Sequence, residues 1–220
     1  MSSDVGIGTT QRTSTTIPYT RDGATDTYSS RERLLTCGKR LIAKFGYEYV
    51  STAAIAQAAG ASEFELLQQF GTKAGLLETI LNESWKPLNT RFADIVMASV
   101  TVRDAAIAIL AAMIHVLERD PELAKLMLFE SRRQRGDTEI RLSKGFMDFI
   151  GLLIRIVERG QKDGSFTTSL EPTAITSALM GAAEGMVRDR LLAELQNQLT
   201  PFSQAQLRST FEVIVAGLAP

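Results

Sequence analysis

The sequence has very few of the residues that metal sites and redox chemistry need. It contains one cysteine, Cys37, and one histidine, His115, among its 220 residues. A single cysteine excludes a disulfide within the chain and agrees with a reducing compartment. One histidine and one cysteine make no metal-binding cluster. We therefore expect no metal and no cofactor, and we interpret Cys37 as a small core residue of a helix.

Catalytic signatures and membrane segments are also missing. The chain has no G-x-S-x-G, P-loop or G-x-G-x-x-G motif, and its carboxylates are scattered along helix surfaces, so we do not expect an enzyme. The N-terminus lacks the charged-then-apolar pattern of a signal peptide. The longest clean apolar run, from Ala105 to Ile114, is too short to span a bilayer. These absences predict a cytoplasmic protein without a membrane partner.

Neither sign of charge is in excess. The formal net charge is −1, so the chain as a whole has no generic attraction to nucleic acid, and any affinity for DNA must come from local charge. Hydrophobic residues make up 45% of the sequence, which is enough for a packed core. Residues 1–28, rich in Ser, Thr and Gly, predict a flexible tail.

Helical periodicity is present from residue 29 onward, and strand-like alternation is not, so the sequence predicts an all-α fold. After a first group of short helices, Asp120 and Pro121 are expected to cap and begin one helix. Gly145 and Gly151 are expected to interrupt another, and Pro201 to open the last. The predicted helices cover about residues 73–98, 102–119, 121–133, 137–162, 172–196 and 201–218.

The most informative stretch, residues 45–73, predicts a helix, a glycine turn and a second helix. Ser51 and Ser62 are each placed to cap a helix, because a hydroxyl can accept from the free N–H groups of a first turn. Gly60 lies between the two helices, where the chain needs a positive φ. A preceding helix over residues 31–46 has one apolar and one basic side. This is the helix-turn-helix arrangement, which lays its second helix in the DNA major groove.

Four sequence motifs in this region resemble the N-terminal domain of the TetR family of bacterial regulators. They are R-x-x-L-L at 31–35, A-K-F-G-Y at 43–47, S-T-x-x-I-A-x-x-A-G-A-S at 51–62 and F-x-T-K-x-x-L-L at 70–77. The resemblance covers about residues 31–81. It implies a ligand-responsive transcription regulator, more often a repressor, with a DNA-binding-type domain at 29–72 and a helical effector-binding and dimerisation domain at 73–220.

The resemblance also implies which residues meet DNA. Ser51, Thr52 and Lys73 would hold phosphates. The second helix would face the groove with Ser62, Glu63, Phe64, Glu65, Gln68 and Gln69.

Several of these residues depart from the family pattern. Phe64 stands where the family has a small residue, and Leu67 stands where it has a phosphate-contacting Tyr. Glu63 and Glu65 are repelled by phosphate unless they accept from cytosine. Residues 29–75 carry six basic and four acidic side chains, a small excess for a domain that must neutralise phosphates.

A family C-terminal domain commonly encloses an apolar pocket, which implies an apolar small-molecule effector. Met and aromatic side chains at helical spacing are also ordinary core residues, and that alternative stays open for each one. The candidates to line the pocket are Trp85, Met113, His115, Phe129, Phe146, Phe149 and Met180.

Two helices near the C-terminus carry the pattern of a helix–helix interface. Small residues line one side of the 172–196 helix, and apolar residues line the last helix. The resemblance implies a four-helix interface in a C2 homodimer; without it, packing within one chain explains the pattern equally well. The candidate interface residues are Ala174, Ala178, Gly181, Gly185, Leu207, Phe211 and Ile214.

Two hypotheses follow. The first is a dimeric regulator that binds palindromic double-stranded DNA and is released by an apolar effector. The second is a TetR-like protein that no longer reads DNA and acts as a ligand-binding or protein-interaction module. Phe64 and Leu67 discriminate, because burial of both leaves a polar helix for DNA, whereas exposure of both creates an apolar patch suited to a protein partner.

Overall fold

The computed structural model describes residues 29–130 and 142–220. Within these ranges every regular element is a helix, and the expected all-α fold is confirmed. The tail predicted at 1–28 lies outside the described residues. The division into domains at residue 72 stays a prediction.

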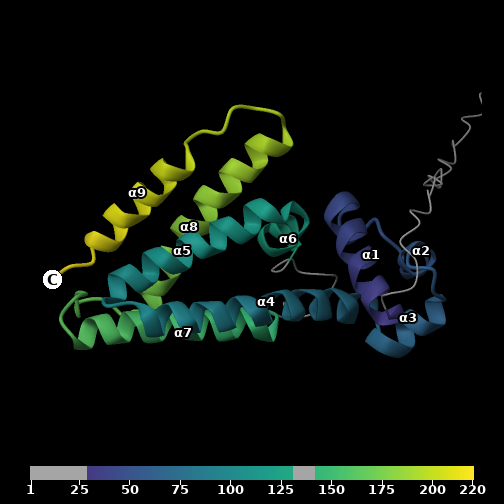
Figure 1. The fold of residues 1–220 in the computed structure, drawn as a ribbon, viewed down its shortest axis with the longest axis horizontal. Helices are drawn as coiled ribbons and strands as arrows, with labels where there is room; N and C mark the ends of the chain where they lie inside the picture. The colour runs from purple at the N-terminus through teal and green to yellow at the C-terminus, as the bar shows by residue number, and fades with distance from the viewer. Residues whose placement is uncertain (1–28, 131–141) are drawn as a thin grey trace, which may run out of the picture.

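Three short helices form one end of the molecule (Figure 1). They are α1 (Ser30–Phe45), α2 (Thr52–Ala58) and α3 (Glu63–Phe70). Each contributes at least one fully buried aliphatic side chain, namely Leu34, Ile55 and Leu66, all at 0% exposure. Other buried residues of these helices and of the loop between the first two complete this small core, among them Ile42, Val50 and Ala56.

Helix α4 (Lys73–Ala98) links that end to the rest of the chain and packs against α7 (Lys144–Lys162) along the long axis of the molecule (Figure 1). The two helices approach most closely at Gly145, where an added Cβ would lie 2.3 Å from the Cβ of Trp85. Asn82 Oδ1 accepts from the Gly145 N–H at 3.0 Å, and Asn89 Nδ2 donates to the Gly145 carbonyl at 2.8 Å. Only glycine fits this contact.

The remaining helices build a second layer over α4 and α7 (Figure 1). They are α5 (Val102–Arg119), α8 (Pro172–Leu195) and α9 (Gln204–Ala216), with α5 contacting both α7 and α9. The short α6 (Pro121–Lys125) continues into a π-helical turn, η1 (Leu126–Glu130), and both lie against α1. The α6–η1 segment therefore joins the two ends of the molecule.

Two predicted helix boundaries are wrong. Helix α7 begins at Lys144 rather than at 137, because Ser143 caps it by accepting from the Phe146 N–H at 3.3 Å. Gly145 and Gly151 lie inside this helix and do not interrupt it. The last helix begins at Gln204, after a capping box at Ser203, so Pro201 precedes it. The predicted end of a helix near 133 lies outside the described residues.

Candidate functional site

The helix-turn-helix has the local geometry that the sequence predicts. Ser51 Oγ accepts from the Ala54 N–H at 3.1 Å, which caps α2, and Ser62 Oγ accepts from the Glu65 N–H at 3.1 Å, which caps α3. Gly60 joins them with a φ of 64°. Both predicted caps and the predicted turn are confirmed.

Most of the residues expected to meet DNA are on the surface. Thr52 and Glu65 are partly buried, and the exposed members are Ser51, Ser62, Glu63, Phe64, Gln68 and Gln69. Phe64 is 73% exposed and Leu67 is 41% exposed, so both discriminating side chains are outside the core. Helix α3 therefore presents an apolar pair, with Gln68 on the same face four residues after Phe64.

The two carboxylates of α3 are held by the chain itself. The Thr52 hydroxyl donates to Glu63, which ties α2 to α3. The Ser62 N–H donates to Glu65 Oε2 at 2.7 Å and the Ser62 hydroxyl does so at 3.0 Å. These bonds, the backbone one first, lower the pKa of Glu65 below its ordinary value of 4.5. Both acids thus stabilise the motif locally.

Lys73 has contacts within the chain that the sequence did not indicate, and its implied phosphate contact stays a prediction. The structure places its ammonium against the α1–α2 loop. Lys73 Nζ donates to the carbonyls of Tyr47 and Val50 at 2.8 and 2.9 Å and lies 4.2 Å from the centre of the Tyr47 ring. Because its ammonium donates to these two carbonyls, Lys73 holds the α1–α2 loop against α4.

Other basic residues of α1 are also engaged within the chain. Arg31 pairs with Glu83 of α4 at 2.6 Å, Arg33 Nε donates to the Ala59 carbonyl at 3.0 Å, and Lys39 bonds Asp120. Arg40 and Lys44 are exposed. The basic side of α1 therefore contributes fewer cations to a DNA surface than its sequence indicated.

Tyr49, in the loop before α2, is a surface residue that the sequence analysis did not select. Its side chain is 87% exposed, two residues before the Ser51 cap. A phenol so placed can donate to a phosphate at the edge of the motif. The signal was present in the sequence, since the tyrosine lies two residues before the first cap of the helix-turn-helix.

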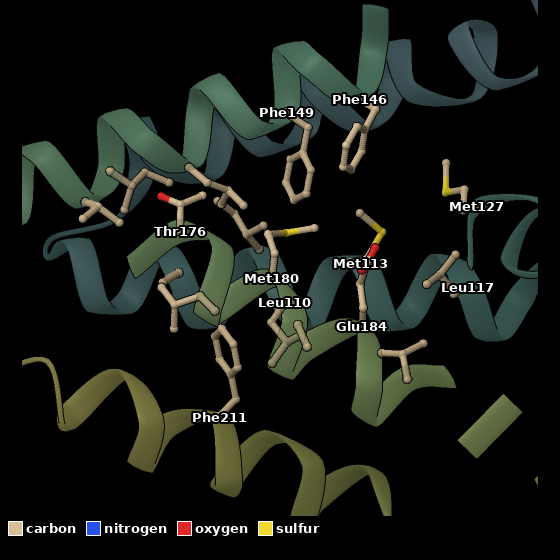
Figure 2. Close-up of a pocket in the computed structure, with 18 of the residues that line it drawn as sticks. Leu110, Met113, Leu117, Met127, Phe146, Phe149, Thr176, Met180, Glu184 and Phe211 are labelled. Atoms are coloured by element: carbon tan, nitrogen blue, oxygen red, sulfur yellow. The ribbon is translucent and has the colours of Figure 1, made fainter. Parts of the chain in front are cut away.

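The second candidate site is an apolar cavity of about 90 Å³ at the other end of the molecule. Figure 2 shows Phe146 and Phe149 of α7 facing Met113 of α5 and Met180 of α8, with Phe211 of α9 closing the lower side. Trp85 stacks on Phe149 at 5.1 Å between ring centres and also lines the cavity. Five of the seven predicted lining residues are present: Trp85, Met113, Phe146, Phe149 and Met180.

Two of the predicted lining residues are wrong. His115 is exposed on α5, one position past the inward-facing Ile114. Phe129 is 37% exposed in η1, while its neighbours Met127 and Leu128 face the cavity. The π-helical turn changes the angle between successive side chains, so a regular helical period misplaces Phe129.

The cavity also has lining residues that the sequence analysis missed. Thr176 and Glu184 bring the polar atoms of α8 to it, and Phe211 reaches it from α9. Thr176, Met180, Glu184 and Val187 recur at helical spacing, so the inward side of α8 was readable from sequence. Glu184 is the carboxylate on that side. The indole Nε1 of Trp85 is buried and has no hydrogen-bond partner in the described residues.

Comparison with protein families decides the identity of this two-site arrangement. The model of bacterial regulatory proteins of the tetR family matches residues 34–80, and the model of the YsiA-like protein C-terminal region matches residues 87–217. The chain belongs to the TetR family. Members of this family are transcription regulators, in agreement with the prediction that the chain is not an enzyme. Comparison with curated proteins gave no significant match.

Solved TetR-type structures share the fold at low sequence identity. The fatty acid degradation regulator FadR from Bacillus halodurans is 18% identical, with a TM-score of 0.72 over 85% of this chain and 98% of that one. FadR from Bacillus subtilis, solved with stearoyl-CoA, is 19% identical, with a TM-score of 0.74 over 84% and 98%. The MbdR regulator from Azoarcus sp. CIB is 18% identical, with a TM-score of 0.64 over 87% and 100%.

The outer side of α8 in this TetR-family chain agrees only in part with the predicted interface. Ala174, Ala178 and Gly181 are exposed, and a Cβ added at Gly181 or Gly185 would meet nothing within 4 Å. The prediction is wrong for two residues of α9. Leu207 is 1% and Phe211 5% exposed within the single chain, because the apolar side of α9 packs on its own α5. Ile214 is partly buried.

Two further properties bear on the TetR-family assignment. In residues 29–130 and 142–220, side chains able to ligate a metal nowhere gather in groups of three or more. None of the helices in the described part of the chain has the length and apolar character needed to cross a bilayer.

Proposed function

We propose that this TetR-family protein is a DNA-binding repressor that acts as a homodimer and leaves its operator when an apolar effector enters the cavity. The observation that carries the proposal is the direct path between the two sites. Met127 and Leu128 of η1 line the cavity, and the adjoining α6 packs on α1 of the helix-turn-helix.

One side chain, that of Asp120, links α6 to α1. Asp120 Oδ1 accepts from the Leu123 N–H at 3.0 Å and caps α6, while its Oδ2 bonds Lys39 of α1. A ligand that displaces η1 would move α6, and the Asp120–Lys39 pair would pass the movement to the DNA-binding end. Such a ligand shifts the dimer toward a geometry whose recognition helices no longer match successive grooves.

The effector we propose is mostly apolar. A cavity of about 90 Å³ is smaller than a long acyl chain, so a large effector must move its walls. Met113, Met127 and Met180 can do so, because an unbranched thioether side chain repacks at low cost. The Bacillus subtilis FadR structure holds stearoyl-CoA. A long acyl thioester is therefore the first compound to test.

The dimer we propose uses the exposed side of α8, with Val213 of α9, which is 72% exposed, beside it. Small residues at Ala178 and Gly181 allow two helices to approach closely. A Gly181→Arg variant would place a charged side chain in that contact and give monomers in sedimentation velocity, whereas Asp94→Arg, at an exposed position of α4, leaves a dimer. Dimers in both variants would reject this interface.

The first test of the proposal is selection of bound fragments from random double-stranded DNA by the full-length protein. The winning site is then titrated at several salt concentrations. A palindromic site whose affinity falls steeply with salt supports a dimeric DNA-binding regulator. A folded, dimeric protein that enriches no sequence contradicts it.

The second test addresses the effector. Stearoyl-CoA is expected to raise the melting temperature and to release the operator fragment, and free coenzyme A is expected to do neither. Asp120→Asn keeps a good cap residue for α6 but removes the charge that pairs with Lys39. This variant should bind both operator and effector while releasing less DNA. Unchanged release would reject the Asp120 path.

One observation favours the interaction-module hypothesis as a second candidate function. Both Phe64 and Leu67 are exposed, which is the outcome associated with a protein partner. The DNA selection discriminates here as well, because an interaction module with this apolar pair enriches no sequence.

A further inference from the structure

Helix α3 exposes two large apolar side chains on one face. Phe64 is 73% and Leu67 41% exposed, and residues three positions apart in a helix are neighbours on its surface. Leu66, which lies between them in sequence, is fully buried in the core, whereas Phe64 lies mostly outside it and Leu67 is half-buried. Leaving a phenylalanine in water forgoes a burial free energy of about 1.5 to 3 kcal/mol. The exposed area of the pair is thus available for contact with a partner.

The polar residues around this pair limit what α3 can read. Glu63 accepts from Thr52, and Glu65 accepts from Ser62, so both carboxylates have partners inside the motif. Gln68 and Gln69 are exposed without a carboxylate among them. The face of α3 that carries the apolar pair therefore also carries Gln68, four residues after Phe64, and the internally bonded carboxylate of Glu63, four residues before Leu67.

The apolar and the amide side chains of α3 both favour an A·T base pair. The C5 methyl of thymine is the apolar group that a base presents in the major groove, and phenylalanine contacts it. A glutamine side chain pairs with the N6 and N7 atoms of adenine. A helix face that offers Phe64 and Leu67 beside Gln68 is complementary to A·T pairs from both strands.

We propose that Phe64 and Leu67 read thymine methyl groups in the operator, so that each half-site has A·T pairs under the start of α3. This inference rests on the proposed DNA-binding function and specifies its sequence recognition. It also assigns a function to Phe64 and Leu67, which depart from the family pattern, since a bulky apolar residue extends farther toward the base edges than a small one.

The experiment removes the methyl group from one thymine at a time without changing base pairing. In the site selected from random DNA, each thymine is exchanged singly for deoxyuridine, which lacks only the C5 methyl, and affinity is measured by fluorescence anisotropy with full-length protein. At contacted thymines we expect an affinity loss of about fourfold, the effect of about 0.8 kcal/mol for one buried carbon group. Other thymines should show no change.

Three variants assign the effect to side chains. Phe64→Ala should weaken binding to the thymine site and should abolish the deoxyuridine effect at its own position, and Leu67→Ala should do so at a neighbouring position. Met97→Ala is the control, since Met97 is an exposed apolar residue, at 86%, near the far end of α4. It should retain both the affinity and every deoxyuridine effect.

The outcomes separate this inference from the proposed function. An enriched site that tolerates deoxyuridine throughout, or that keeps its deoxyuridine effects in both α3 variants, overturns thymine reading and leaves the regulator intact. Absence of any enriched site overturns the regulator and thymine reading together. The apolar pair would then be the surface for a protein.

Discussion

The helix-turn-helix and the apolar cavity are built from opposite kinds of interaction. In the first, short-range hydrogen bonds dominate, such as Ser62 with Glu65 three residues away. In the second, side chains from helices far apart in sequence meet, such as Trp85 with Phe149 and Phe146. Local bonds hold the short helices of the motif, whereas long-range apolar contacts surround a cavity.

The comparison teaches where this protein can respond to a ligand. Capped short helices have few alternative arrangements, because each turn is held by its own side chains. An apolar cavity lined by methionines has many arrangements of similar energy. The proposed function requires an element that connects the cavity to the helix-turn-helix, and α6–η1 occupies that place in the structure.

The largest expected change in the free energy of unfolding comes from a substitution in the wall of the cavity. Phe149→Ala removes a side chain that is 3% exposed and stacked on Trp85, and should lower the free energy of unfolding by about 3 to 5 kcal/mol. Urea unfolding measures the change. Saturating benzene should recover part of the loss, because an enlarged apolar cavity binds small apolar molecules. A loss below about 1 kcal/mol would mean that this wall is not packed as described.

A smaller effect tests the close approach of α4 and α7. Gly145→Ala puts a Cβ 2.3 Å from the Trp85 Cβ and should cost about 1 to 3 kcal/mol. Gly151→Ala is the control on the same helix, because its Cβ would meet only the end of the Arg155 side chain at 3.4 Å. That variant should gain up to about 1 kcal/mol from helix propensity. Equal midpoints of urea unfolding in the two variants would contradict the helix contact.

Removal of a cap tests the local side of the comparison. Ser62→Ala deletes the hydroxyl that caps α3 and should cost about 1 kcal/mol. Ser203→Ala deletes the equivalent cap of α9, where Gln206 completes the capping box. Similar losses in both variants, measured by urea unfolding, would show that caps contribute alike at the two ends. A neutral Ser62→Ala would show that tertiary contacts alone hold α3.

The pH dependence of stability sharpens the same point. Hydrogen bonds from Ser62 lower the pKa of Glu65, so this contribution is complete above the ordinary value of 4.5 and is lost as pH falls through the folded-state value. Glu65→Gln retains an acceptor but does not titrate. Its stability should therefore fall less than that of the parent protein on acidification, as measured by unfolding midpoints between pH 7 and 3. Parallel curves would contradict the capping box.

The smallest effect on folding is expected at Phe64. Phe64→Ala repeats the substitution proposed for Phe149 at a side chain that is 73% exposed, and should change the free energy of unfolding by at most about 0.5 kcal/mol. Thermal unfolding of the two variants side by side measures the contrast. Strong destabilisation by Phe64→Ala would show that this side chain is packed in solution.

The sequence by itself determined the features that depend on neighbours within a few residues. The caps at Ser51 and Ser62, the positive φ of Gly60 and the three-helix motif follow from short-range hydrogen bonding and steric freedom. The family resemblance extended this to the domain plan. Five cavity residues were also predictable, because apolar residues at helical spacing face inward.

Only the tertiary structure decided the features that depend on which helices meet. Lys73 turned to backbone carbonyls of the α1–α2 loop, Phe211 faced the cavity instead of a partner subunit, and Phe129 left the cavity at a π-helical turn. The exposure of Phe64 was equally undetermined. Helical periodicity identifies the apolar side of a helix, but the surface that covers that side is chosen by contacts between residues far apart in the chain.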